Sequence, residues 1–255
     1  QLTQSVAVAV GDVAVWAFDV GGVDNPARLP GVLPGAAGQT LELVQTNPSI
    51  NTDPIEIDLL ADPPGTALAV DPDAAVLFAA ADTARLDEMN PGSRTIAADP
   101  AGAVLRGRLA LNESGEVSVS GSSVTGSHEV SLHSRHATLV SDPGRRTVTL
   151  PASDEATLAA TTNLAPGHEV AVRLAFESGA TPARTATGTV APDPGDAVGR
   201  VEVSLDLAGV ADGTAFTATV RGPADERLTR RSGTVRLVPR ASVTFDDQQA
   251  RDDGS

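Results

Sequence analysis

The residue with the clearest chemical signal in this sequence is Asn112, which opens the sequon Asn112-Glu113-Ser114. Asparagine followed by any residue except proline and then by serine or threonine accepts N-linked glycans, and the acceptor must lie in a surface loop. We expect that loop to be the tip of a hairpin, NESG, between the strands VLRGRLAL and EVSVS. The alternative is an asparagine that merely tolerates a turn conformation. Asn112 is therefore our candidate glycosylation site.

Three histidines occur close together in the segment SHEVSLHSRH, namely His128, His133 and His136. Metal ligands on one strand must share a face, but His133 has the opposite parity to the other two. The H-E-x-x-H spacing of zinc enzymes is also missing. The pattern therefore indicates exposed strand histidines and not a metal site.

Two acidic turns have the oxygen ligands that calcium prefers. The first, DVGGVDN, contains Asp19, Asp24 and Asn25, and the second, VDPDAA, contains Asp71 and Asp73. Neither turn follows the EF-hand pattern. Because acids are frequent along the whole chain, solvated surface carboxylates are the simpler interpretation of both turns. We expect no bound cofactor, with calcium as the one exception that the acidic turns allow.

Sequence signatures of enzymes are missing: there is no G-x-S-x-G elbow, no P-loop and no G-x-G-x-x-G after a strand. His168 lies beside Glu169 with no nucleophile close to it in the sequence. A triad or a carboxylate pair assembled from distant residues remains open at this stage. Sugar-cleaving enzymes stack aromatic rings on their substrate, and this chain has only five Phe, one Trp and no Tyr. We expect a protein without catalytic residues that is not an enzyme.

The chain is strongly negative, and its basic residues are of a single type. Asp and Glu number 33 against 18 basic residues, giving a net charge of −15, and all 18 basic residues are arginine. In about 1 M salt the Debye length falls to about 3 Å, so repulsion between carboxylates is screened and an acidic surface stays soluble. This composition indicates a protein of a halophile, the alternative being an acidic protein of a GC-rich mesophile. No basic patch is visible, which argues against nucleic acid as a partner.

Cysteine is missing from the chain, which excludes disulfides, thiolate metal sites and cysteine nucleophiles but leaves the compartment open. No run of about 18 apolar residues is present, so we expect no transmembrane segment. The start does not resemble a signal peptide, and we expect an exported chain to have lost its signal already.

The second half of the sequence is dominated by short alternating strands. In the segment NLAPGHEVAVRLAF, Val170, Val172, Leu174 and Phe176 occupy every second position, which places them on one face of a strand. The runs TATGTV, RVEVSLDL, AFTATV and GTVRLV repeat this alternation between Gly, Pro and Asp turns. The pattern predicts a two-sheet sandwich of the immunoglobulin-like type.

The first half shows the same strand pattern with two interruptions. We expect residues 5–10 and 12–18 to form a hairpin or a bent strand around Gly11, and residues 76–81 to form a fully buried strand. A long Gly- and Pro-rich stretch, residues 21–38, predicts a loop. Asp82 is expected to cap a helix of about two turns, TARLDEM. Further strands are expected in TLELV, PIEIDLL, VSLH, ATLV and TVTL.

These elements predict an all-β protein with two tandem immunoglobulin-like β-sandwich domains. We place the junction at the segment PASDE, which gives an N-terminal β-rich domain at residues 1–153 and a C-terminal sandwich at residues 154–243. Residues 244–255 form an acidic tail or the start of a further domain.

The order NLAPGHEVAVRL, then TGTV, then VEVSLDLAGVADGTAFTATVRG resembles a β-sandwich domain of surface (S-layer type) glycoproteins from halophilic archaea, sometimes called the BGTF surface domain. The closing VTFDDQQARDDGS resembles the opening of a domain that often follows it in those proteins. The resemblance covers residues 156–255 and extends only loosely to earlier residues. It implies a structural cell-surface component, brings no catalytic residues, and implies that divalent ions such as calcium bridge acidic subunits.

We therefore expect an extracellular, glycosylated protein of the cell surface that associates with copies of itself into an S-layer-like lattice or an extracellular filament. The opening strand LTQSVAVAV is available to pair with the sheet of an adjacent subunit. The alternative is an adhesion or ligand-binding module of a secreted or surface protein, with residues 21–38 as its binding loop. A hydrolase with a dispersed site is the third hypothesis.

Overall fold

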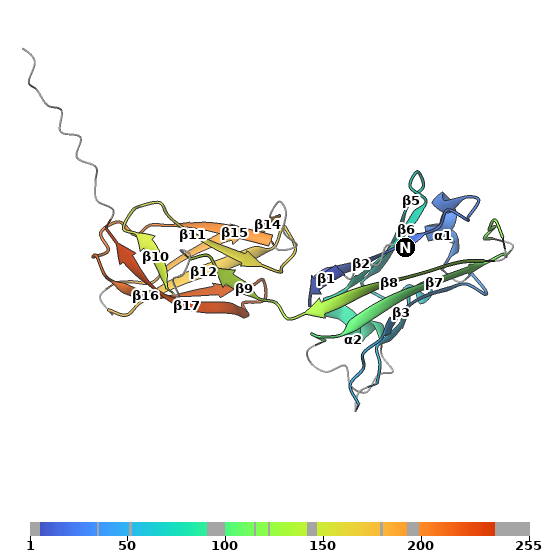
Figure 1. Cartoon of the computed structure of the whole chain (residues 1–255), viewed down its shortest axis with the longest axis horizontal. Coiled ribbons are helices and arrows are strands. Elements are labelled where there is room, and N and C mark those ends of the chain that lie inside the picture. Colours follow the sequence, from blue (N-terminus) through green and yellow to red (C-terminus); the bar gives the residue numbers. More distant parts are fainter. Residues whose placement is uncertain are drawn as a thin grey trace, which may run out of the picture. The chain divides into compact units, whose positions relative to one another are not determined.

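The computed structural model shows a chain built from β-strands with a few short helices (Figure 1), which confirms the all-β prediction. None of the helices in the described part of the chain is long and apolar enough to cross a membrane. The predicted tail at residues 244–255 lies outside the described residues. Those are residues 6–34, 36–50, 53–90, 100–114, 116–121, 123–141, 147–178, 181–192 and 199–237.

The chain forms two compact units. The first consists of residues 1–138, 161–169 and 189–201, and the second of residues 139–160, 170–188 and 202–255. The junction expected between residues 153 and 154 falls inside the second unit, because β10 (Val148–Pro151) already pairs in parallel with β17 (Arg227–Arg236).

The first unit contains two sheets, which we call sheet I and sheet II. Sheet I has the order β1-β8-β7-β3-β4, with β1 at Val6–Ala9, β8 at Ser123–His133, β7 at Val104–Asn112, β3 at Thr40–Gln45 and β4 at Glu56–Asp58. Sheet II has the order β2-β6-β5, with β2 at Val13–Asp19, β6 at Val76–Asp82 and β5 at Thr66–Asp71.

The chain passes from sheet I to sheet II at Gly11. Its φ of +88° lies in the left-handed region that glycine adopts without strain. On one side of this turn β1 pairs in parallel with β8, and on the other side β2 pairs antiparallel with β6. Of the two arrangements expected here, the bent strand is therefore correct and the hairpin is wrong. The opening strand lies at the edge of its own sheet.

The core of the first unit lies where β2 crosses β7 and β8. Alternate residues of β2 are buried, including Trp16 at 0% and Phe18 at 2% exposure. A Cβ on Gly107 would lie 2.7 Å from Trp16 Cδ1, and one on Gly126 would lie 3.2 Å from Phe18 Cδ1. The two glycines therefore make room on sheet I for the two largest rings of the core.

The strand that pairs with β7 is not the predicted one. We expected EVSVS, residues 116–120, but β7 pairs with β8, which begins at Ser123. Val117 and Val119 are instead buried in the connection, and Val119 forms an isolated bridge with Val23. The alternation in EVSVS thus reflects side chains packing beneath a loop and not a sheet strand.

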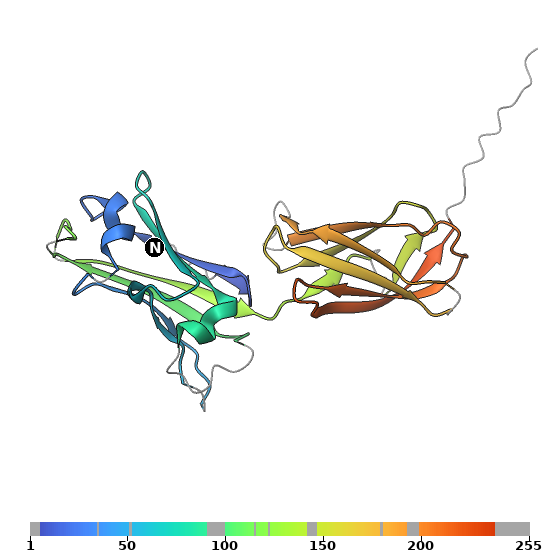
Figure 2. The ribbon, with the colours of Figure 1, turned by 180° about the vertical axis from the view of Figure 1, so that it is seen from behind.

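The stretch 21–38 was expected to be a loop but contains two short helices. The 3-10 helix η1 spans Pro26–Arg28 and the helix α1 spans Leu29–Val32. Leu29 and Leu33 are buried at 1% and 0% exposure, and α1 packs beside β5 (Figure 2). Two leucines spaced one turn apart are enough to hold the stretch against the core.

The helix predicted after Asp82 exists in a modified form. Asp82 Oδ1 accepts a hydrogen bond of 2.9 Å from the backbone N–H of Ala84, which confirms the predicted cap. The segment divides into the 3-10 helix η3 (Thr83–Arg85) and the helix α2 (Leu86–Met89). The strand β6 before it is half-buried, with alternate residues inside, and not fully buried as expected. A similar 3-10 helix, η2 (Leu59–Ala61), follows β4.

The remaining strands form two further sheets. Alternate side chains such as Leu158, Val172, Val203 and Phe216 are buried, which gives the second unit its own apolar core. Sheet III has the order β14-β15-β11-β9, with β14 at Ala191–Pro192, β15 at Gly199–Leu205, β11 at Ala156–Thr162 and β9 at Ala137–Leu139. Sheet IV has the order β10-β17-β16-β12-β13, with β16 at Ala215–Arg221, β12 at Glu169–Phe176 and β13 at Arg184–Thr189.

Candidate functional site

The predicted glycosylation residue, Asn112, is the last residue of β7 and is exposed, but it does not lie at a hairpin tip. Its side-chain Nδ2 donates a hydrogen bond of 2.6 Å to the carbonyl of Gly38. Its backbone N–H donates to Gln39 Oε1 at 2.8 Å, and Gln39 Nε2 donates back to the Asn112 carbonyl at 3.0 Å. The acceptor nitrogen of the sequon therefore also joins β7 to the residues that precede β3.

The other two sequon residues hold the loop that follows. Ser114 Oγ accepts from the backbone N–H of Val117 at 3.1 Å, and Glu113 Oε2 accepts from that of Val119 at 2.8 Å. These bonds order the connection between β7 and β8 on the surface. Access for a glycan is retained because Asn112 and Glu113 are both exposed.

The predicted calcium turns use their carboxylates for hydrogen bonds within the protein. Asp71 Oδ1 accepts from the backbone N–H groups of Asp73 and Ala74, both at 3.0 Å, and so closes the turn between β5 and β6. Asp24 accepts from the hydroxyls of Ser118 and Ser120 at 2.6 and 3.2 Å. Within the described residues, no three His, Asp or Glu side chains are arranged to hold a metal ion, the histidines of SHEVSLHSRH included.

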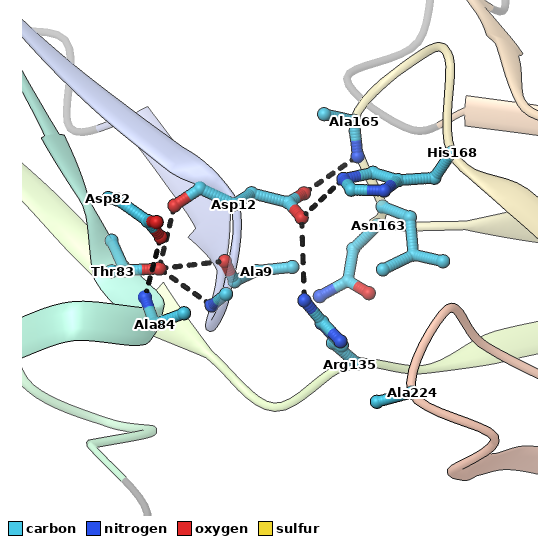
Figure 3. Close-up of polar contacts among 12 residues, drawn as sticks. Ala9, Asp12, Asp82, Thr83, Ala84, Arg135, Asn163, Ala165, His168 and Ala224 are labelled. Atoms are coloured by element: carbon cyan, nitrogen blue, oxygen red, sulfur yellow. Dashed lines mark hydrogen bonds and ion pairs between the residues drawn. The ribbon is translucent and has the colours of Figure 1, made fainter. Parts of the chain in front are cut away.

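A buried polar group that the sequence did not single out, Asp12, contacts several segments of the first unit (Figure 3). Its side chain is only 3% exposed. Oδ2 accepts a hydrogen bond of 2.7 Å from the backbone N–H of Ala165, and Oδ1 lies 2.8 Å from His168 Nε2. Arg135 Nη2 lies 4.0 Å from the same Oδ1. One buried carboxylate thus joins the turn after β1 to residues 161–169 of the same unit.

Thr83 fixes the backbone around Asp12. Its Oγ1 donates a hydrogen bond of 2.7 Å to the Asp12 carbonyl and accepts one of 2.7 Å from the N–H of Gly11. The backbone N–H of Thr83 also donates a hydrogen bond of 3.1 Å to the Asp12 carbonyl. Thr83 is 2% exposed. The turn between sheets I and II is therefore tied to the start of η3, as Figure 3 shows.

Asp12 and His168 are two of the three residue types of a Ser-His-Asp triad. The sequence had left open whether His168 belongs to a triad assembled from distant residues. In the described residues, no serine or threonine hydroxyl is hydrogen bonded to His168. Thr83, the nearest hydroxyl to Asp12, is committed to the backbone. The arrangement therefore suits a buried carboxylate that fixes two segments of chain through its contacts with Ala165 and His168.

A different kind of site lies on the outer face of sheet II. In register across the sheet, Val15 lies beside Ala80 and Ala80 beside Ala67, while the next row on this face joins Ala17, Phe78 and Ala69. Val13 and Val15 are 58% and 44% exposed. We call this surface, defined by Val13, Val15, Ala17, Ala67, Ala69, Phe78 and Ala80, the apolar face.

The apolar face ends in carboxylates. Asp19 and Asp71 flank Val76 in register at one end, and Asp73 lies in the adjoining turn. All three aspartates are exposed. A contiguous apolar surface with a polar border is the arrangement by which one protein recognises another.

Comparison with known proteins does not place the chain in a family. No family model matches the sequence. No curated protein matches it either. Among solved structures, a similar chain is described as "Crystal Structure of Rst D1-D2"; it is 11% identical, and the match covers 92% of this chain and 96% of that chain with a TM-score of 0.29. Similarity this low carries no argument about fold or function.

Proposed function

We propose that this chain is a structural component of the cell surface of a halophilic archaeon, where it associates with copies of itself into an S-layer-like lattice or an extracellular filament. The observation that carries the proposal is the apolar face. Its valines and Phe78 lie on the outer face of a sheet, where they add nothing to the stability of an isolated copy. Burying such a face against a neighbour removes apolar area from water, at about 25 cal/mol per Å².

The amino-acid composition supports the proposal that the protein works in concentrated salt. A net charge of −15 with no lysine keeps copies apart in dilute solution through mutual repulsion. In molar salt this repulsion is screened while apolar contacts persist, so the apolar face can dominate association. A glycan on Asn112, which lies in the first unit on sheet I, is part of this proposal, as is the absence of a catalytic role.

The alternative function, an adhesion or ligand-binding module, depended on residues 21–38 being a free binding loop. These residues contain η1 and α1, and Leu29 and Leu33 anchor them in the core. No described feature therefore favours that alternative over self-association.

The test is the size of the particle in salt. We expect the wild-type chain to form assemblies visible by electron microscopy and light scattering in about 3 M KCl, where charge repulsion is screened. Val15→Arg places a positive charge on the apolar face and should abolish them. Ile50→Arg is the matched control, because Ile50 is fully exposed and does not belong to that face. A wild-type chain that stays monomeric at every salt and calcium concentration would refute the proposal.

A further inference from the structure

Four arginines lie together on the outer face of sheet IV, although no basic patch is visible in the sequence. Arg173 lies on β12, Arg221 on β16, and Arg227 and Arg230 on β17. In register across the sheet, Thr219 lies between Arg173 and Arg230, and Arg221 lies opposite Arg227. We call these four residues the arginine face. β16 and β17 follow one another in the sequence, but β12 is distant from both, so the pairing of β12 with β16 brings Arg173 to the other three arginines.

Most of this positive charge is unused within the chain. Arg221 Nη1 contacts Asp225 Oδ2 at 3.0 Å, but Asp225 is 82% exposed. The side chains of Arg173, Arg227 and Arg230 are exposed and form no hydrogen bond or ion pair with any residue that the structure describes. Like charges directly opposite on a sheet are unfavourable for folding. The arginine face is therefore better explained by binding of a partner than by a contribution to the stability of the unit.

The arginine face is also a shallow groove and not four isolated side chains. Phe176, Thr217 and Thr219 line the groove between the guanidinium groups. Glu177 is the one acidic residue in its lining. Small threonines at the centre and long arginines around them leave space for a flat surface to approach.

The apolar face on the first unit has the complementary chemistry. It is three strands wide, as is the arginine face, and its acidic end presents Asp19, Asp71 and Asp73. Asp19 and Asp71 each use Oδ1 in their own turns, and Asp73 forms no side-chain hydrogen bond with a described residue. Carboxylate oxygens are therefore available at the edge of an apolar surface.

We propose that the arginine face of one copy docks on the apolar face of a second copy; this inference rests on the proposed self-association and specifies its surfaces. The aliphatic stems of the arginines cover the alanines and valines. Their guanidinium groups reach the aspartates at the acidic end, where charge-assisted hydrogen bonds form at contact distance and persist in salt.

Charge decides between this arrangement and a symmetric one. Two apolar faces packed on each other bring two acidic ends of the same sign into one interface, and two arginine faces do the same with cations. Docking of unlike faces pairs opposite charges and leaves one face of each kind free at either end of the pair. Such a head-to-tail contact adds further copies without limit unless it closes into a ring.

Two variants separate head-to-tail docking from other modes of association. Arg173→Glu/Arg230→Glu disables the arginine face, and Val15→Arg/Ala67→Arg disables the apolar face; all four positions are exposed, so the fold is retained and circular dichroism verifies it. Each variant alone should be monomeric by analytical ultracentrifugation in high salt. An equimolar mixture of Val15→Arg/Ala67→Arg with Arg173→Ser/Arg230→Ser, whose altered face is uncharged, should form heterodimers and nothing larger, because each variant supplies the face that the other lacks.

The remaining outcomes each decide the question. Arg28→Glu, an exposed charge reversal on η1, should assemble as the wild type does, which shows that the effect is local and not one of net charge. If the wild type assembles and Arg173→Glu/Arg230→Glu assembles equally, the docking inference is wrong while the proposed function stands. A wild type that never assembles refutes the proposed function itself. Binding of a labelled oligonucleotide that Arg173→Glu/Arg230→Glu abolishes would assign the arginine face to nucleic acid and overturn the inference.

Discussion

His168 Nε2 lies 2.8 Å from Asp12 Oδ1, although the two residues are far apart in the sequence. A carboxylate this deeply buried loses its hydration, and in place of water it meets a hydrogen bond from the N–H of Ala165, the ring of His168 and, at 4.0 Å, the guanidinium group of Arg135. The contact makes the turn at Gly11 dependent on residues 161–169 for its conformation.

Replacing Asp12 with alanine should therefore destabilise the protein strongly. Asp12→Ala leaves the N–H of Ala165 and the Arg135 guanidinium without this acceptor, and we expect a loss of about 3 kcal/mol in the free energy of unfolding. Urea denaturation in high salt measures it. Glu155→Gln removes an exposed carboxylate and should change stability by less than about 0.5 kcal/mol. Equal effects of the two variants would show that the Asp12 contacts contribute nothing.

A methyl group at position 107 should disrupt the core. In Gly107→Ala the new Cβ would lie 2.7 Å from Trp16 Cδ1 and 2.9 Å from Phe18 Cζ, so both rings must move. Overpacking of this kind costs about 1–3 kcal/mol, and near-UV circular dichroism of Trp16 should change with it. In Gly31→Ala the Cβ meets nothing within 4 Å, and α1 should become slightly more stable. An unchanged melting temperature for Gly107→Ala would contradict the packing described here.

The cap at Asp82 should make a smaller contribution to the free energy of unfolding, confined to the helices that it begins. Asp82→Ala removes the acceptor for the Ala84 N–H, and we expect a loss of about 1 kcal/mol. Hydrogen exchange should show the change in η3 and α2 before it appears elsewhere. Asp154→Ala, at an exposed position outside any helix, is the control and should exchange as the wild type does.

The proposed glycan has a direct test by mass spectrometry of protein expressed in a halophilic archaeon. Ser114→Ala removes the sequon but keeps the bonds of Asn112 to Gly38 and Gln39, so the glycan mass should disappear from a folded chain. Ser127→Ala, at an exposed position on β8, should leave the mass unchanged. An identical mass for wild type and Ser114→Ala would exclude N-glycosylation at Asn112.

Stability should rise with salt over the whole molar range. With a net charge of −15, lowering KCl from about 3 M to about 0.1 M lengthens the Debye length several-fold and restores repulsion between carboxylates. We expect the melting temperature followed by circular dichroism to fall steeply. A sucrose series that matches the water activity serves as the control. A melting temperature independent of salt would refute adaptation to brine.

The sequence predicts the strands of the second half well because Val170, Val172 and Leu174 combine strict alternation with turn residues on either side. For β8 it predicts only the last residues, 130–133, and misses residues 123–129, where Gly126 is unfavourable in a strand, yet Phe18 requires the space that a glycine leaves. Local pattern cannot reveal such a requirement, because the ring comes from a different sheet.

The same limit applies to the candidate sites. The sequon at Asn112 is visible in the sequence, but its bond to Gly38 is not. Asp12 seemed to be an ordinary turn residue until the fold brought His168 to it. The arginine face depends on strand register, since Arg173 on β12 and Arg230 on β17 are separated in the sequence by four strands, β13 to β16, and lie on either side of Thr219.

The parallel pairing of β1 with β8 has a consequence for synthesis of the protein. As the ribosome extends the chain, the segment Val6–Ala9 emerges first but has no partner until Val130–His133 has been translated. In the second unit, β10 likewise waits for β17. Closing such long loops is slow, and the waiting strands are exposed in the meantime. A nascent chain halted before β8 should therefore bind chaperones or be cleaved by proteases. Once β8 and β17 have been translated, β1 and β10 can pair with them.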